Sequence, residues 1–198
     1  VDPDGWMSFD TAGRLLNECI AATGCPHFGL LLGRRFSPAT LGVVFQLMKH
    51  AGSLREAIRS LVLHLHLHDR GGVVALNPHG AENVELSYLI HHPNTPGTAQ
   101  ILDASIAIAC SVMRCLCGAR WAPSEVMLSR DRPRLVAPYR SFFRAPIRFD
   151  APHSALIFPA RFLDQPVAGA DPATRTRLLG LAAELDAARP ATITELTI

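Results

Sequence analysis

Residues 95–118 read TPGTAQILDASIAIACSVMRCLCG, which is the strongest helix prediction in the chain. Thr95 or Thr98 can cap the start of a helix here, and Gly118 can end it. The apolar residues between these ends surround nearly the whole circumference, which is typical of a helix buried on all sides. Asp103 and Arg114 interrupt the apolar run, which favours a core helix over a membrane span. We therefore predict a central buried helix with the other elements packed around it.

Three further helices are predicted before this central helix. The stretch SFDTAGRLLNECIAATG (residues 8–24) reads as the first, with Gly24 as its C-terminal stop. A second is expected to begin near Ser37, with Pro38 at the first helical position, and to end at Gly52.

A third helix is predicted from Leu54 onwards. Ser53 and Glu56 have the spacing of a capping box, in which each side chain can bond the other residue's backbone amide. This helix should continue into LVLHLHLHDR (residues 61–70), and the sequence DRGG at its end should stop it.

The remaining chain reads as short strands with two further helices. Strands are predicted at VVALN and NVELSYLI, which flank a turn at Pro78-His79-Gly80, and then at EVMLS, IRF and ALIF. Short helical segments are expected at residues 137–143 and 172–188. The predicted class is α+β: several helices packed on one mainly antiparallel sheet, in a single domain with a central buried helix.

Composition limits the function classes. Of 198 residues, 48% are hydrophobic and 18% charged, which fits one soluble globular domain, and a net charge of +2 is too small for a nucleic-acid-binding surface over the whole chain. The five cysteines are an odd number, and no secretory signal precedes them, so we expect free thiols and a cytoplasmic location. No phosphate loop, nucleophile elbow or Cys-His signature is present. We predict no enzyme activity, no catalytic residue and no cofactor.

The alternating histidines His64, His66 and His68, followed by Asp69, suggest a metal site. Zinc hydrolases use related patterns next to a strand, where residues two apart share a face. On the predicted helix, however, His64 and His68 lie about 40° apart and His66 points about 200° away. His64 and His68 can then close the core or line a ligand pocket, and we predict no metal. A metal- or haem-binding sensor or hydrolase built on the three histidines is the alternative function.

Asp103 and Arg114 are the charged residues of the central helix. They share a face but are separated by about 16 Å along the axis, so they cannot pair directly. Because an unpaired buried charge is costly, we expect each to lie near solvent or backbone at its end of the helix. Contact with a polar group of a ligand is the other possibility.

Five segments in order resemble a known family: TGCPHFGLLLG, SLREAIRSLVLHLHLHDRG, LCGARWAPSEVMLSRDRP, APYRSFFRAPIRFDAPHSALIFPARFLDQPV and GADP. Together they are similar to the arabinose-binding-like N-terminal effector domain of AraC-type transcription regulators, over residues 10–175. The resemblance implies a sensory domain that binds a small metabolite, acts as a homodimer, and controls helix-turn-helix motifs that bind DNA.

The resemblance also implies a division of the chain. Residues 1–170 are expected to form the effector-sensing domain, and residues 171–198 a helical linker towards a DNA-binding domain that does not occur in this sequence. Leu178, Leu181 and Leu185 could pack this linker on the domain or on a partner chain. DNA contact is expected through the missing domain alone, and no membrane is expected as a partner.

The ligand pocket is predicted between the third helix, the central helix and the inner face of the sheet. We expect it to be mostly apolar with a few polar groups. The candidate ligand-binding residues are His64, His68, Tyr88, Asp103 and Phe158. A pure dimerisation module with a closed pocket is a third possible function.

Overall fold

The molecule contains a five-stranded sheet with the order β1-β2-β5-β3-β4. The computed structural model describes residues 7–92 and 94–188. The strands are β1 (Gly72–His79), β2 (Asn83–Ile90), β3 (Glu125–Met127), β4 (Ile147–Arg148) and β5 (Ser154–Pro159). All neighbours pair antiparallel except β3 and β4, which are parallel. The predicted mainly antiparallel sheet is confirmed.

The β1–β2 hairpin is confirmed, with its turn later than predicted. Pro78 and His79 still pair with Val84 and Asn83 as part of β1. The chain reverses after them, where Gly80 adopts a positive φ of 66°. A left-handed conformation of this kind suits glycine, which has no Cβ.

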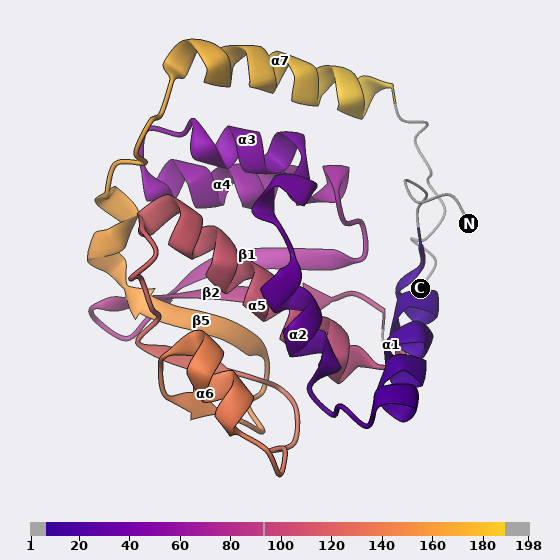
Figure 1. Ribbon diagram of the computed structural model, residues 1–198. Coiled ribbons are helices and arrows are strands. Elements are labelled where there is room, and N and C mark those ends of the chain that lie inside the picture. The colour runs from indigo at the N-terminus through magenta and orange to yellow at the C-terminus, as the bar shows by residue number, and fades with distance from the viewer. Residues whose placement is uncertain (1–6, 93, 189–198) are drawn as a thin grey trace.

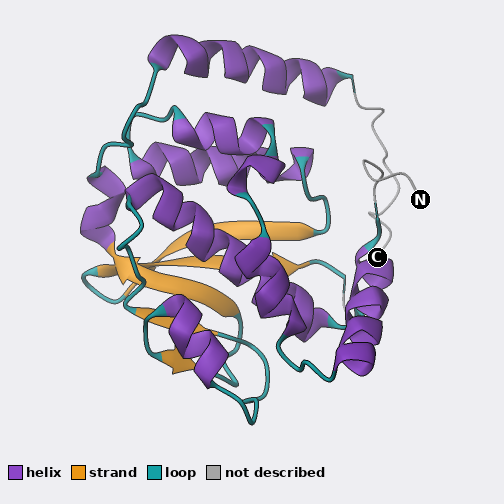
Figure 2. Cartoon of the chain, in the orientation of Figure 1, coloured by secondary structure: helices purple, strands orange, loops and turns teal. Residues whose placement is uncertain are grey.

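Helices cover the sheet, as Figures 1 and 2 show. The described residues form seven α-helices: α1 (Phe9–Thr23), α2 (Phe28–Arg35), α3 (Val43–Lys49), α4 (Leu54–His64), α5 (Thr98–Cys117), α6 (Ala137–Phe143) and α7 (Pro172–Ala187). Short 3-10 helices lie at η1 (Pro38–Leu41), η2 (Leu65–Leu67) and η3 (Ala160–Asp164). The class is therefore α+β, as predicted.

The central position of α5 is confirmed. In Figure 1, α5 runs diagonally across the sheet, and it packs on β2 and β5. By length and composition α5 could also cross a membrane, but most of its residues are buried inside this fold, as in the core helix of a soluble protein. Gly118 ends it with a φ of 100°. The predicted threonine cap is wrong, because Gly97 holds the N-cap position and the Thr98 hydroxyl donates to the Thr95 carbonyl.

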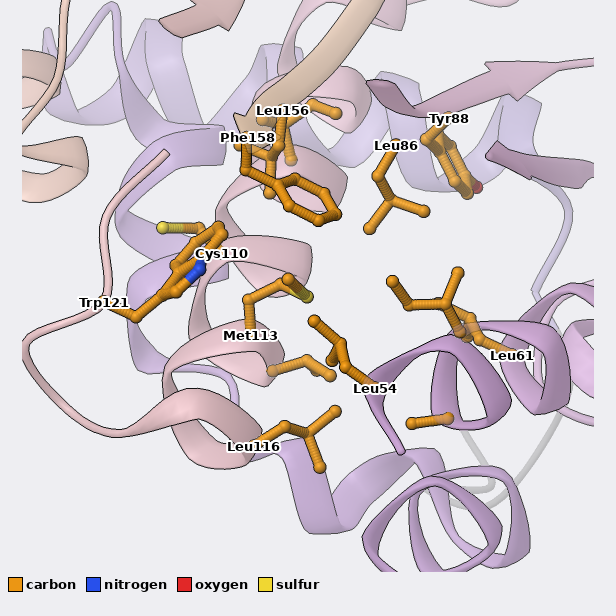
Figure 3. Packing of buried hydrophobic residues seen from close by; sticks show 14 of the residues in the cluster. Leu54, Leu61, Leu86, Tyr88, Cys110, Met113, Leu116, Trp121, Leu156 and Phe158 are labelled. Carbon is orange, nitrogen blue, oxygen red and sulfur yellow. The ribbon is translucent and has the colours of Figure 1, made fainter. Parts of the chain in front are cut away.

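The core lies between α5, α4 and the sheet. Figure 3 shows Leu54 of α4 pointing toward Met113 of α5, with Leu156 and Phe158 of β5 above them in the view. These side chains belong to one continuous cluster of buried hydrophobic residues.

The segment before α4 differs from the prediction. The expected helix from Ser37 to Gly52 is broken at Gly42, whose φ of 59° and ψ of −130° are not helical, so η1 and α3 are separate. Helix α2 was not predicted. It packs on α5 through Gly29 and Gly33: a Cβ at Gly29 would lie 2.0 Å from the Gln100 carbonyl oxygen. Glycine at both positions therefore allows the two backbones to approach closely.

Helix α4 begins as predicted. The Glu56 amide donates to the Ser53 hydroxyl over 3.3 Å, while the Glu56 carboxylate accepts from the Gly52 amide over 2.9 Å, one residue earlier than expected. The helix ends at His64 rather than running through the histidines, and the chain tightens into η2. This change of helix type alters the directions of the histidine side chains.

Helix α7 lies at the top of the view in Figure 1, against α3. Asp171 caps its start by accepting from the amides of Ala173 and Thr174. Arg175 joins it to the domain by donating to the Leu47 carbonyl over 2.7 Å and to the Ser60 hydroxyl over 3.1 Å. The predicted helix is confirmed, whereas the rest of the expected linker, 189–198, lies outside the described residues.

Candidate functional site

A cavity of about 90 Å³ lies between α4, η2, α5 and the first two strands. Its position is the one predicted for the pocket. Most of its wall is aliphatic, and its polar groups come from the chain after η2, from β2 and from α5. The lining residues are Leu41, Leu61, Leu65, His68, Asp69, Val74, Leu86, Ser87, Tyr88, Ser105, Ile106, Ile108, Ala109 and Val112.

Asp69 organises the polar end of this cavity. One carboxylate oxygen, Oδ1, accepts from the amides of Gly71 and Gly72, each over 3.0 Å. The other, Oδ2, accepts from the Tyr88 hydroxyl over 2.5 Å. Ser105 of α5 also lines the cavity. Both oxygens of Asp69 are thus engaged by the protein.

The local sequence explains this arrangement. An aspartate often bonds the amides two and three residues ahead, and Asp69 does so in a sequence with two glycines. Gly72 also makes room for the tyrosine, because a Cβ at that position would lie 2.2 Å from the Tyr88 hydroxyl oxygen. The pairing of Val74 with Tyr88 across the hairpin then places the phenol at the cavity.

The polar end holds neutral groups beside its carboxylate. Burial, with the neighbouring Asp69 charge, raises the pKa of Tyr88 far above its usual range, so the phenol stays protonated. Burial lowers the pKa of His68 below 6.5, although Asp69 opposes the shift. The imidazole is therefore neutral at pH 7 and packs edge-on against Phe36, with ring centroids 6.2 Å apart.

Of the five candidate residues, His68 and Tyr88 line the cavity. His64 does not line it. The prediction that His64 and His66 point to opposite sides is wrong, because the rings lie 6.4 Å apart. His66 bonds Asp186 of α7 over 2.6 Å, and burial lowers the pKa of His64. The cause is the change from α to 3-10 geometry after His64, which turns the side chains by a different angle per residue.

Asp103 lies in a separate polar cluster. It is 1% exposed, and its Oδ2 accepts from Arg130 over 2.5 Å and from the Tyr139 hydroxyl over 2.6 Å. Its other oxygen is buried with no partner within the described residues. Burial raises the pKa of Asp103, while Arg130 and Tyr139 oppose the shift. The expectation that Asp103 lies near solvent is wrong, because Arg130 reaches it from a distant loop.

Arg114 follows the prediction of backbone contact. Its guanidinium donates to the carbonyl oxygens of Trp121, Phe142 and Phe143. Phe158, the last of the candidates, is fully buried against Trp121, with ring centroids 5.8 Å apart, and forms part of the packed core.

Sequence reasoning missed Asp69 and Ser105 as cavity residues. Asp69 was considered only as a metal ligand, although the DRGG sequence carries the signal of an aspartate turn. No local signal identifies Ser105, because its role depends on how α5 is rotated against β2. Within residues 7–92 and 94–188, no group of three or more His, Cys, Asp or Glu side chains is arranged to hold a metal ion.

An α+β domain whose core holds a mainly apolar cavity with one polar end is built like a ligand-binding domain. The family model described as the arabinose-binding domain of AraC transcription regulator, N-terminal, matches residues 1–167. The chain belongs to this family, so it is an effector-binding domain of AraC-type transcription regulators.

The chain is also similar to individual transcriptional regulators. The HTH-type transcriptional regulator VirS of two Mycobacterium tuberculosis strains is 25% identical over 173 residues, which cover 87% of this chain and 51% of VirS. The chain thus spans about half the length of these curated relatives. In fold, it resembles the crystal structure of the transcriptional regulator CdpR from Pseudomonas aeruginosa, with a TM-score of 0.67 and 18% identity over 90% of this chain and 63% of that one.

Proposed function

We propose that this domain senses a small molecule in the cavity between α4, α5 and the β1–β2 hairpin. The observation that carries the proposal is the polar end formed by Asp69, Tyr88 and His68 inside an otherwise aliphatic wall. In this proposal residues 1–170 form the sensing part and residues 171–198 the linker towards a DNA-binding domain. The activity is binding rather than catalysis, in the cytoplasm.

The element that would transmit binding is η2. Leu65 and His68 line the cavity, while His66 between them bonds Asp186 of α7. The amides of His68 and Asp69 both donate to the Leu65 carbonyl over 2.8 Å, so hydrogen bonds connect the residues of this turn. A ligand that displaces Leu65 or His68 therefore changes the position of His66 and its bond to Asp186 of α7. The shift requires a ligand that prefers one of the two arrangements.

Helix α7 also supports the proposed homodimer. Leu181 and Leu185 are exposed on it, and Leu178 lies one turn before them. These positions are three and four residues apart and share one face of the helix. We propose that a second copy of this chain packs on that face, so that a change in α7 would alter the spacing of two DNA-binding domains.

A panel of metabolites tests the proposal. A molecule that binds the folded state raises its melting temperature. We expect at least one metabolite to do so, and to change hydrogen exchange of α7 amides as well as cavity amides. In His66→Ala the change in α7 should shrink while binding persists. Arg14→Ala is the control, because it breaks an exposed ion pair with Asp10 on α1, away from the cavity.

Two results would contradict the proposal. If no metabolite in a broad panel changes the melting temperature, the domain is not a sensor of this kind. If a ligand protects the cavity while exchange in α7 stays the same, η2 does not transmit binding.

A further inference from the structure

The cavity has one polar end and an aliphatic remainder, and this asymmetry restricts what it can bind. Leu61, Leu65, Ile106, Ile108 and Val112 supply most of the wall from α4, η2 and α5. The hydrogen-bonding side chains come from β2, from Ser105 of α5 and from the residues after η2. A ligand that matches this wall has an apolar body and polar atoms at one end.

The polar end offers neutral hydrogen-bonding groups. Asp69 already accepts hydrogen bonds from two backbone amides and from Tyr88, which leaves about one of its four lone-pair positions for an ammonium group. A buried ammonium group would lose its hydration in exchange for that one position. The negative charge of Asp69 also repels an anion. Among the described residues that line the cavity, none is a lysine or an arginine that could neutralise a carboxylate. The Tyr88 and Ser105 hydroxyls and the His68 imidazole remain to meet a neutral donor or acceptor.

A sugar does not match this cavity. A pentose carries hydroxyl groups along its whole length, and each buried hydroxyl without a partner costs about 1–3 kcal/mol. The aliphatic wall provides no such partner beyond the polar end. The size also suits a small ligand, because about 90 Å³ is several times the ~10–15 Å³ needed for one water.

We propose that this cavity binds small, neutral, mainly apolar molecules with a single hydrogen-bonding head group, and that it discriminates against pentoses and carboxylates. The inference rests on the proposed sensing function and specifies its ligand class. The head group bonds the Tyr88 hydroxyl and His68, and the body lies against Ile106, Ile108 and Val112.

Four five-carbon probes test the ligand class: 1-pentanol, pentylammonium, pentanoate and L-arabinose. Each is titrated into the isotope-labelled 198-residue chain while backbone amide NMR shifts are followed. We expect saturable shifts around the cavity for 1-pentanol, at least tenfold weaker binding of pentylammonium and pentanoate, and no saturable shift with L-arabinose.

Three variants locate the binding. Ala109→Leu fills the cavity and should abolish the pentanol shifts. Tyr88→Phe removes the head-group partner and should weaken pentanol binding about fivefold to tenfold, as expected for one lost hydrogen bond. Tyr139→Phe is the matched control, because Tyr139 is also a buried tyrosine bonded to an aspartate but does not line the cavity. It should bind pentanol like the unmodified chain.

The outcomes separate the two proposals. If pentylammonium, pentanoate or L-arabinose binds more tightly than 1-pentanol and Ala109→Leu abolishes it, the ligand class is wrong but the cavity remains the sensing site. If no probe gives shifts that Ala109→Leu removes, the ligand class is also wrong. The sensing proposal is then judged separately, by whether Ala109→Leu abolishes the melting-temperature increase caused by a metabolite from the panel.

Discussion

Two buried tyrosines in this domain make the same hydrogen bond in different surroundings. Tyr88 donates to Asp69 over 2.5 Å, and Tyr139 donates to Asp103 over 2.6 Å. Tyr88 lies at the edge of the cavity, and its aspartate is held by backbone amides of its own turn. Tyr139 is packed edge-on against Phe149, with ring centroids 5.7 Å apart, and its aspartate is held by Arg130.

The two tyrosine–aspartate pairs have different roles because their surroundings differ. At Asp103, an arginine from a distant loop connects α5 to the chain around α6, so the pair holds two parts of the fold together. At Asp69, the partners are local, and the pair leaves hydroxyl groups facing unfilled volume. A buried polar group next to empty space is available to a ligand, whereas one surrounded by packed side chains is structural.

The largest loss of stability is expected when the ion pair between Asp103 and Arg130 is broken. Arg130→Met leaves the Asp103 carboxylate buried without its cation, which costs about 3–5 kcal/mol of unfolding free energy. Urea unfolding measures the loss. Arg132→Met, on an exposed neighbour in the same loop, should change stability by less than ~0.5 kcal/mol. A loss below ~1 kcal/mol for Arg130→Met would show that the pair does not hold the fold.

The second-largest difference in stability is expected between two alanine-to-leucine variants of α5, one facing α2 and one facing the cavity. Ala107 is fully buried towards α2, where a Cβ on Gly33 would approach its Cβ to 2.7 Å, whereas Ala109 lines the cavity. Ala107→Leu should destabilise by about 1–3 kcal/mol through overpacking, while Ala109→Leu should be neutral or slightly stabilising. The melting temperatures of both variants test this. Equal losses would mean that the cavity does not accept added volume.

A smaller difference in stability is expected between the variants that remove each tyrosine hydroxyl. Tyr139→Phe removes one of the two partners of a nearly fully buried carboxylate oxygen and should cost about 1–3 kcal/mol. Tyr88→Phe should cost about 1 kcal/mol or less, because Asp69 keeps two backbone amides and the cavity edge can admit water. Chemical denaturation of both variants provides the comparison. A larger loss for Tyr88→Phe would reverse the roles assigned to the two pairs.

We expect a small loss of folding stability at acid pH because of His68. Burial lowers the folded-state pKa of His68 below its ordinary value of 6.5, so the unfolded chain binds a proton more readily. Stability should therefore fall as the pH decreases from about 6.5 through the lowered pKa, and be unaffected by this group above 6.5. His68→Gln should reduce the fall. Parallel stability curves for the two proteins between pH 7.5 and 5 would exclude His68 as the cause.

Local signals predicted much of the framework. The Ser53–Glu56 spacing identified the start of α4, Gly24 and Gly118 identified helix ends, and the alternation around residues 73–90 identified the hairpin. Each of these signals acts within a few residues of the feature that it determines. Helix α2 was missed because its two glycines, Gly29 and Gly33, have a role only when α5 packs against them.

The sequence predicted where the cavity lies but only some of the residues that line it. The apolar circumference of residues 98–117 and the pattern of the hairpin locate a pocket between helices and sheet, and His68 and Tyr88 line it. Asp103 was assigned to the pocket because a charge in an apolar helix suggests a ligand. Its partner Arg130 lies 27 residues away, a distance over which sequence carries no pairing signal.

The α+β class, the central helix and the resemblance to a family of regulators could be predicted from the sequence, because they depend on hydrophobic periodicity, capping residues and the order of segments along the chain. The pairing of Asp103 with Arg130, the contact of His66 with α7 and the bond between Asp69 and Tyr88 at the cavity could be seen only in the three-dimensional structure. These contacts depend on the rotation of one element against another and on the switch from α to 3-10 geometry after His64. Packing over the whole domain determines both the rotation of the elements and this change of helix geometry.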